Sequence, residues 1–211
     1  MQTDMTVGKP MKMILDFTIP VFIGNVFQQF YNMADAIIVG KFVGTKGLAA
    51  VGATGTIMFL IIGFLMGLTA GFTVLTSQKF GAGKMDEMRQ SVGNAALLSV
   101  AISVIMTVGS MVGMRALLTL MHTPEDIFQD SYTYIMIICG GIFAQVLYNI
   151  LASILRALGN SKTPLYFLIL AALLNVALDL LFIIVFHMGV AGAAWATITA
   201  QGVSGLLCLV Y

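Results

Sequence analysis

Six long apolar runs dominate this sequence and leave few folds open to it. A helix of about 20 apolar residues covers the hydrocarbon core of a bilayer, and each run reaches that length. Of the 211 residues, 59% are hydrophobic and 9% are charged, unlike a soluble domain of this size. Strands of a membrane barrel would be about 10 residues long and would alternate apolar with polar residues, which these runs do not. We therefore expect an all-α membrane protein. The predicted spans cover residues 17–40, 48–77, 90–113, 131–155, 163–186 and 188–211.

The Lys and Arg residues between the spans predict which ends face the cytoplasm, because short cytoplasmic loops carry an excess of both. A cytoplasmic N-terminus places seven basic residues inside and three outside. The first run is too long for the core of a signal peptide, so we expect it to remain as a span. The sequence thus predicts a multi-pass protein of the cytoplasmic (inner) cell membrane with both termini in the cytoplasm. The inner set is Lys9, Lys12, Lys79, Lys84, Arg89, Arg156 and Lys162, and the outer set is Lys41, Lys46 and Arg115.

Several classes of function find no support in the sequence. The formal net charge of +1 leaves no electrostatic footprint for nucleic acid. Cys139 and Cys208 lie inside apolar runs, where they suggest neither a disulfide framework nor a metal site. Gly81 and Gly83 lack the further glycine of a phosphate-binding loop, because Gln78 stands at that position. We predict no enzyme activity, no cofactor and no nucleic-acid partner.

Two aspartates lie inside the predicted spans, Asp35 in the first and Asp179 in the fifth. A carboxylate near the middle of a bilayer helix costs about 3 kcal/mol even on the mildest insertion scale. Such residues usually face the interior of a bundle and mark a path or site for an ion or substrate. These two residues therefore guide the functional interpretation.

The first span carries a polar stripe. Asn25, Gln28, Asn32 and Asp35 follow one another at intervals of 3, 4 and 3 residues, which places them on one side of a helix. One interpretation is a hydrogen-bonded seam between helices, since Asn and Gln often hold membrane helices together. The other, which we favour because a seam needs no ionisable residue, is the wall of a polar cavity. Pro20 lies below the stripe and predicts a hinge, because proline removes a backbone hydrogen bond.

Further polar residues lie at helical spacing in later spans. Asn175 and Asp179 are at i and i+4 in the fifth span, Thr197 lies in the sixth, and Asn149 lies on a polar stripe of the fourth. At about 1.5 Å of rise per residue, Asp35 and Asp179 lie at a similar depth, roughly 8 and 10 Å from the outer ends of their spans. A cluster of Asp35, Asn175, Asp179 and Thr197 is possible if the first, fifth and sixth helices are neighbours.

Paired carboxyl groups in a bundle of low dielectric cannot both ionise at low cost, so the pair should take up a proton or hold a cation. The oxygen donors of Asp, Asn and Thr suit a hard ion such as Na⁺ at Asp35 and Asp179, and they do not suit zinc. Paired intramembrane aspartates can also hydrolyse peptides. The residues that flank Asp35 and Asp179 lack the glycine of intramembrane aspartyl proteases, so we do not favour that chemistry.

Several short motifs resemble the multidrug and toxic compound extrusion (MATE) family, in the same order and over essentially the whole chain. Asp179 at the end of the fifth motif, in place of a second Asn, resembles the DinF-like branch more than the NorM-like branch. The motifs are Pro20 to Asp35, Val39-Gly40 with Leu48 to Gly52, Gly81 to Gly83, Arg156 to Pro164, Asn175 to Asp179, and Gly189 to Thr197.

This resemblance implies a secondary antiporter that expels organic, often cationic, amphipathic compounds in exchange for H⁺ or Na⁺ by alternating access. Family members have twelve helices in two similar lobes, so this chain resembles the N-lobe alone, residues 1–211, and the C-lobe would be its partner. We interpret the chain as a truncated one, and less readily as a half that pairs with a second copy. The resemblance places the coupling ion at Asp35, Asn175, Asp179 and Thr197. The predicted substrate cavity comprises Gln28 and Tyr134 from the resemblance, and Asn32 and Asn149 from the polar stripes.

Two other functions stay open. A flippase of the same superfamily would move a lipid-linked head group through a similar cavity and would need a more cationic interior. A membrane assembly subunit without transport activity would also explain six spans, and its ligand binding would not depend on ions. Substrate identity and the choice between H⁺ and Na⁺ do not follow from the sequence.

Overall fold

The computed structural model describes residues 10–211, and every regular element in that part of the chain is helical. Five helices are long and apolar enough to cross a membrane, and a sixth span results if the bent pair α4 and α5 counts as one. The predicted all-α membrane fold is confirmed. The elements are α1 (Pro10–Phe42), α2 (Thr45–Gly81), α3 (Met85–Leu120), α4 (Glu125–Gly140), α5 (Ile142–Ala157), α6 (Lys162–Asp179), the π-helix η1 (Leu180–Val185) and α7 (Gly189–Val210).

Most helices are longer than the apolar runs that predicted them, because polar residues at the membrane surface continue the helical turns. α2 has 37 residues and α3 has 36, well above the 20 or so that the hydrocarbon core requires.

The fourth predicted span, 131–155, is not one continuous helix: it bends by 47° between α4 and α5. Pro20, the predicted hinge, lies within the continuous helix α1. Lys9, used in the topology prediction, lies outside the described residues.

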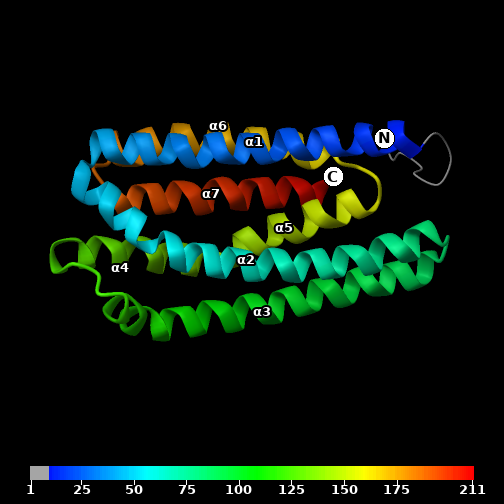
Figure 1. Cartoon of the computed structure of the whole chain (residues 1–211), viewed down its shortest axis with the longest axis horizontal. Helices are drawn as coiled ribbons and strands as arrows, with labels where there is room; N and C mark the ends of the chain where they lie inside the picture. Colours follow the sequence, from blue (N-terminus) through cyan, green and yellow to red (C-terminus); the bar gives the residue numbers. More distant parts are fainter. Residues whose placement is uncertain (1–9) are drawn as a thin grey trace.

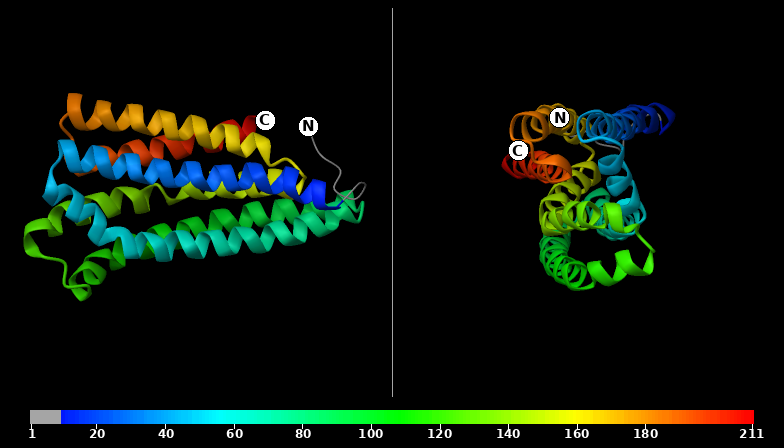
Figure 2. Two further views of the ribbon diagram at one scale, coloured as in Figure 1. Left: turned by 45° about the horizontal axis from the view of Figure 1, so that its top comes forward. Right: turned by 90° about the vertical axis from the view of Figure 1, so that its left-hand side faces the viewer.

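The helices run roughly along one axis and form two groups (Figure 1). α2 and α3 make a long hairpin on one side, and α1, α6 and α7 pack together on the other, with α4 and α5 between the groups (Figures 1 and 2). α6 contacts both α1 and α7, and α1 also contacts α7. The first, fifth and sixth spans are therefore neighbours, as the proposed cluster requires. The chain enters α1 and leaves α7 at the same end of the bundle (Figure 1).

Glycines in the left-handed backbone region end two of the helices at that same end. Gly83 follows α2 with φ of 71°, and Gly159 follows α5 with φ of 81°. At the second turn, the N–H of Asn160 donates to the carbonyl of Leu155 at 2.9 Å, which pairs a carbonyl that the helix leaves free. Residues other than glycine rarely adopt this conformation, so these positions fix the sharp reversals between spans.

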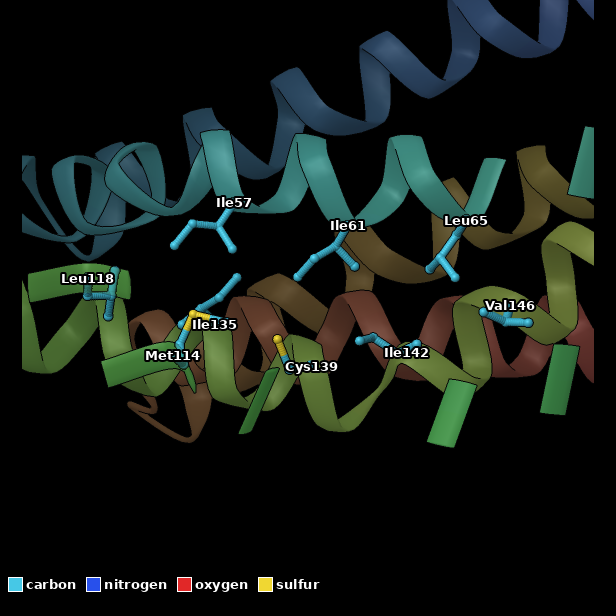
Figure 3. Packing of buried hydrophobic residues seen from close by; sticks show 9 residues of the cluster. All are labelled: Ile57, Ile61, Leu65, Met114, Leu118, Ile135, Cys139, Ile142 and Val146. Carbon is cyan, nitrogen blue, oxygen red and sulfur yellow. The ribbon is translucent and has the colours of Figure 1, made fainter. Parts of the chain in front are cut away.

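One apolar core joins the hairpin of α2 and α3 to α4 and α5. Ile57, Ile61 and Leu65 lie one turn apart along α2 and point toward the other three helices (Figure 3). Met114, Leu118 and Ile135 are fully enclosed in this cluster. Burying a large apolar side chain contributes about 1.5–3 kcal/mol where water is the alternative, and in lipid close packing supplies the preference instead. This core holds the hairpin of α2 and α3 against the bend in the fourth span.

The outward faces of the long helices carry large apolar side chains, as lipid contact requires. Phe59 on α2 is 76% exposed, Val112 on α3 is 81% exposed, and Phe22 on α1 is 65% exposed. Contiguous exposed apolar surface of this extent is typical of a membrane interface and not of a soluble monomer. The chain is a multi-pass membrane protein.

Candidate cation and substrate site

The two intramembrane aspartates meet inside the bundle. Asp35 lies on α1 and Asp179 is the last residue of α6, and their carboxyl groups are direct neighbours. Asp179 is fully buried and Asp35 is 8% exposed. Both therefore face the interior and not lipid, which is where an ionisable residue in a membrane helix can be held.

The backbone changes form directly after Asp179. The π-helix η1 begins at Leu180, and at its end the N–H of the next residue, Phe186, donates to the carbonyl of Leu181 at 3.1 Å. η1 packs against Gly192 of α7, where an added Cβ would lie 3.1 Å from the Cβ of Phe182. A π-helix is rare and often occurs at functional sites, because its wider turn shifts the side chains next to it. No feature of the sequence analysis indicated this element.

Four more polar residues surround the carboxyl pair. Asn175 lies one turn before Asp179 on α6 and is fully buried, and Thr197 comes from α7. The hydroxyl of Tyr31, one turn before Asp35 on α1, lies beside Thr197. Tyr134 of α4 lies close to both carboxyl groups. The structure thus brings together all four residues of the predicted ion site and adds two tyrosines. We call Tyr31, Asp35, Tyr134, Asn175, Asp179 and Thr197 the acidic cluster.

Tyr31 did not enter the sequence prediction as a site residue. The sequence did contain the information needed to predict it, because Tyr31 precedes Asp35 by four residues and so shares a helix face with it. Tyr134 was predicted to line the substrate cavity, and the structure places it in the acidic cluster, packed also against the apolar residues Ile38 and Ile138.

The acidic cluster concentrates buried polar atoms that lack partners. Within residues 10–211, the buried side-chain atoms without a hydrogen-bond partner all belong to this cluster except Ser99 Oγ. A buried polar group left unpaired costs about 1–3 kcal/mol, and more when it is charged. Such a concentration is expected where a protein binds an ion or proton. The cluster atoms are Tyr31 Oη, Asp35 Oδ1, both amide atoms of Asn175, both carboxyl oxygens of Asp179, and Thr197 Oγ1.

The donor set fits a small hard cation or a proton. Two carboxyl groups, an amide oxygen and hydroxyl oxygens are the ligands that such cations prefer. The described residues contain no group of three or more His, Cys, Asp or Glu residues of the kind that holds a transition metal. A proton or a cation between Asp35 and Asp179 would remove the repulsion between their carboxylates.

The polar stripe of α1 divides between two environments. Asp35 is buried and Gln28 is half-buried, whereas Asn25 and Asn32 are exposed. Asn32 donates to Gln29 Oε1 at 3.3 Å, and Gln28 donates weakly to Asn32 Oδ1 at 3.5 Å. Asn25, Gln29 and Asn32 line an open hollow of about 660 Å³ along α1, and Gln28 does not. The amide face does not suit lipid, because polar groups in hydrocarbon need partners.

A second, smaller cavity of about 70 Å³ lies beside Pro20, between α1, α2, α5 and α6. Gln28 and Asn149, two of the predicted substrate residues, both line it. The amide nitrogen of Asn149 donates to the carbonyl of Gln145 at 2.8 Å. We call this space the Arg156 cavity, after the charged residue that also lines it. Of the four predicted substrate residues, Gln28 and Asn149 therefore line this cavity, and Asn32 and Tyr134 do not.

Comparison with known families decides the assignment of the chain. The MatE family model, which describes the MATE transporters, matches residues 20–181, a segment that contains both aspartates of the acidic cluster. The chain belongs to the MATE family. The family resemblance seen in the sequence motifs is thereby confirmed.

Curated MATE relatives are membrane transporters. The Bacillus subtilis protein named "Probable multidrug resistance protein YpnP" is 35% identical over 208 residues, which are 99% of this chain and 47% of that protein. The Escherichia coli protein named "DNA damage-inducible protein F" is 24% identical over 205 residues, covering 90% of this chain and 41% of that protein. Relatives named NorM also match, so the DinF-like branch stays a prediction.

Solved MATE structures share the fold of this chain. A MOP superfamily transporter from Pyrococcus furiosus superimposes with a TM-score of 0.90 at 29% identity, covering 95% of this chain and 44% of that one. A structure described as the outward-facing conformation of a multidrug resistance MATE family transporter gives the same values. The chain spans about half the length of the relatives it matches, which corresponds to one six-helix lobe.

Proposed function

We propose that this chain is one lobe of a MATE drug-efflux antiporter, and that the acidic cluster holds the coupling ion, H⁺ or Na⁺. The observation that supports the proposal is the concentration of unpartnered buried oxygens on Asp35, Asn175, Asp179 and Thr197. The relatives named multidrug resistance proteins support the export of organic compounds, and a second lobe would complete the transporter.

The cluster is suited to coupling because it joins three helices. Asp35 belongs to α1, Asp179 to the junction of α6 and η1, and Thr197 to α7. An ion that binds between them favours the arrangement in which the three helices are close. It can drive transport only if its affinity differs between the two states of the lobe. Pro20 lies on the same helix as Asp35, so a bend of α1 at Pro20 would change the distance between Asp35 and α6.

We further propose that the lobe lies in the cytoplasmic membrane with both termini in the cytoplasm. The described termini lie at one end of the bundle (Figure 1), and that end carries Lys79, Lys84, Arg89 and Arg156. This distribution agrees with the excess of basic residues in cytoplasmic loops.

The test is dye efflux from vesicles that contain a full-length version of this transporter. An imposed gradient of H⁺ or Na⁺ should drive efflux, and Asp35→Asn should abolish the dependence on the ion while the protein remains inserted. Unchanged ion-driven efflux from Asp35→Asn would remove the acidic cluster from the mechanism. The absence of efflux under a gradient of either ion would favour an assembly role instead.

A further inference from the structure

The Arg156 cavity has an unusual charge balance for a lobe expected to handle cationic compounds. Residues of four helices line it, namely α1, α2, α5 and α6. Arg156 is the one charged residue in that lining. Neither acidic residue of α1 adds a negative charge to the lining, since Asp16 is exposed and Asp35 faces Asp179.

Arg156 is half-buried and has no ion-pair partner within 4.0 Å among residues 10–211. Three other basic residues at this end have acidic partners nearby. Lys79 and Lys84 both pair with Glu87, and Arg89 lies 3.9 Å from Asp86. A partly buried guanidinium without a counter-charge is costly, and an anion that pairs with it offsets that cost.

Other groups in the cavity reinforce the preference for negative charge. Ser161 is the residue that precedes α6, so the positive end of that helix dipole points toward the cavity. Gln28 and Asn149 present amide groups from the opposite helices. The hydroxyl of Tyr148 is already used, because it donates to the carbonyl of Pro164 at 3.3 Å.

We propose that the Arg156 cavity binds an oxyanion group, a carboxylate or phosphate, at one end of an amphipathic molecule. The cavity of about 70 Å³ has room for such a group and not for a whole drug-sized molecule. The apolar remainder would extend along Met66, Leu165 and Leu168, which line the same space. A guanidinium can donate two parallel hydrogen bonds to an oxyanion, which a neutral amide cannot match.

This inference rests on the proposed function in so far as the occupant is a transported compound. It then deepens that function by naming a substrate class, because amphiphiles with an acidic group would be handled better than their neutral or purely cationic analogues. The acidic cluster and the Arg156 cavity would serve different charges, a cation beside Asp35 and an oxyanion beside Arg156.

The experiment measures binding of a matched pair of fluorescent probes, dansylated undecanoic acid and its primary amide. The purified full chain is placed in nanodiscs of neutral phosphatidylcholine, and binding is corrected for partition into empty nanodiscs. We expect the acid to bind at least about tenfold more tightly than the amide. Arg156→Gln should bring the two affinities within about twofold, and Arg156→Lys should keep part of the preference because the charge remains.

Lys162→Gln is the matched control, since Lys162 is an exposed cation at the same end of the bundle and does not line the cavity. It should leave the preference for the acid unchanged. Equal affinities of acid and amide for the unsubstituted chain would overturn the proposal. An equal loss from Lys162→Gln and Arg156→Gln would also overturn it, because general surface charge would then explain the preference.

A second arm separates two sources of the oxyanion. Phosphatidylglycerol added to the nanodiscs supplies lipid phosphate in competition with the probe. Competition that disappears in Arg156→Gln would support the site and assign it to a lipid head group, and no competition would support it as a substrate site. Binding needs no transport, so a preference for the acid without ion-driven efflux would refute the proposed function alone. Ion-driven efflux without that preference would refute the oxyanion site alone.

Discussion

Gly141 and Ile198 pack so closely that no side chain fits between them. A Cβ added to Gly141 would lie 2.2 Å from Cγ2 and 2.7 Å from Cβ of Ile198 on α7. Gly141 is also the residue at which the fourth span bends by 47°, and Thr107 of α3 donates to the carbonyl of Cys139 beside the bend at 3.3 Å. The bend is therefore held by contacts from two other helices. Ile198 follows Thr197 of the acidic cluster, so α7 contacts this cluster and the bend with adjacent residues.

Gly141→Ala should destabilise the folded lobe, because the new methyl group must displace Ile198 or the α5 backbone. Overpacking of this kind costs about 1–3 kcal/mol. The same substitution should cost much less in an Ile198→Gly background, because that change removes both Cγ2 and Cβ of Ile198, whereas Ile198→Ala would keep the Cβ at 2.7 Å. The measurement is the unfolding midpoint of the purified chain in detergent for the single and double variants.

Gly140→Ala is the control for that experiment, since an added Cβ at Gly140 meets nothing within 4 Å. It should be neutral or slightly stabilising, because Ala favours a helix by up to about 1 kcal/mol over Gly. Equal losses from the two glycine variants would contradict the proposed contact with Ile198.

Two buried tyrosines should respond in opposite ways to loss of the hydroxyl. The Tyr31 hydroxyl is buried without a partner, so Tyr31→Phe should leave stability unchanged or raise it by about 1 kcal/mol. The Tyr148 hydroxyl donates to Pro164, so Tyr148→Phe should lower stability by about 1 kcal/mol. Chemical or thermal unfolding in the absence of added Na⁺ measures both. A loss from Tyr31→Phe as large as that from Tyr148→Phe would mean that the Tyr31 hydroxyl has a partner in the folded protein.

Glu87 should contribute to stability only above acidic pH. Hydrogen bonds from Lys79 and Lys84 lower the pKa of this carboxyl to about 2, against about 4.3 in an unfolded chain. A lowered pKa means that the contribution is complete above about pH 4.3 and is lost as the pH falls toward 2. The difference in unfolding midpoint between the unsubstituted chain and Glu87→Gln should shrink over that range. About 1 M salt should also shrink it, because these charges are exposed. A difference that does not change with pH or salt would contradict the ion-pair explanation.

Hydropathy predicted the spans, and helical spacing predicted which polar residues share a face, because both depend on local regularities. A run of apolar residues specifies a membrane helix, and an Asn and Asp one turn apart specify a shared face. Asn175 and Asp179 could therefore be grouped by their spacing, and Thr197 was added because it was predicted to lie at a similar depth in the membrane. Their meeting with Asp35 depended on helix order, which only the structure supplied.

The features that the sequence did not predict depend on contacts between distant segments. The bend at Gly141 is set by Ile198, far along the chain, and the run around it is as apolar as a straight span. The π-helix after Asp179 has no compositional signal. On α1, Asn25 and Asn32 lie roughly 60° around the helix from Gln28 and Asp35, at 3.6 residues per turn. That offset is enough to leave Asn25 and Asn32 exposed while Gln28 is half-buried and Asp35 is buried. The stripe that we predicted to lie on one face therefore lies in two environments.

The account depends most on the acidic cluster as a site for a proton or Na⁺. The most direct measurement is the stability of the purified chain as the activity of each ion is varied, with choline replacing Na⁺ to keep ionic strength constant. An ion that binds only the folded lobe should add about 2.7 kcal/mol when present at 100 times its dissociation constant. The account predicts such a response to Na⁺ or to pH, and its loss in both Asp35→Asn and Asp179→Asn. A response that survives in these variants, or no response to either ion in the unsubstituted chain, would contradict it.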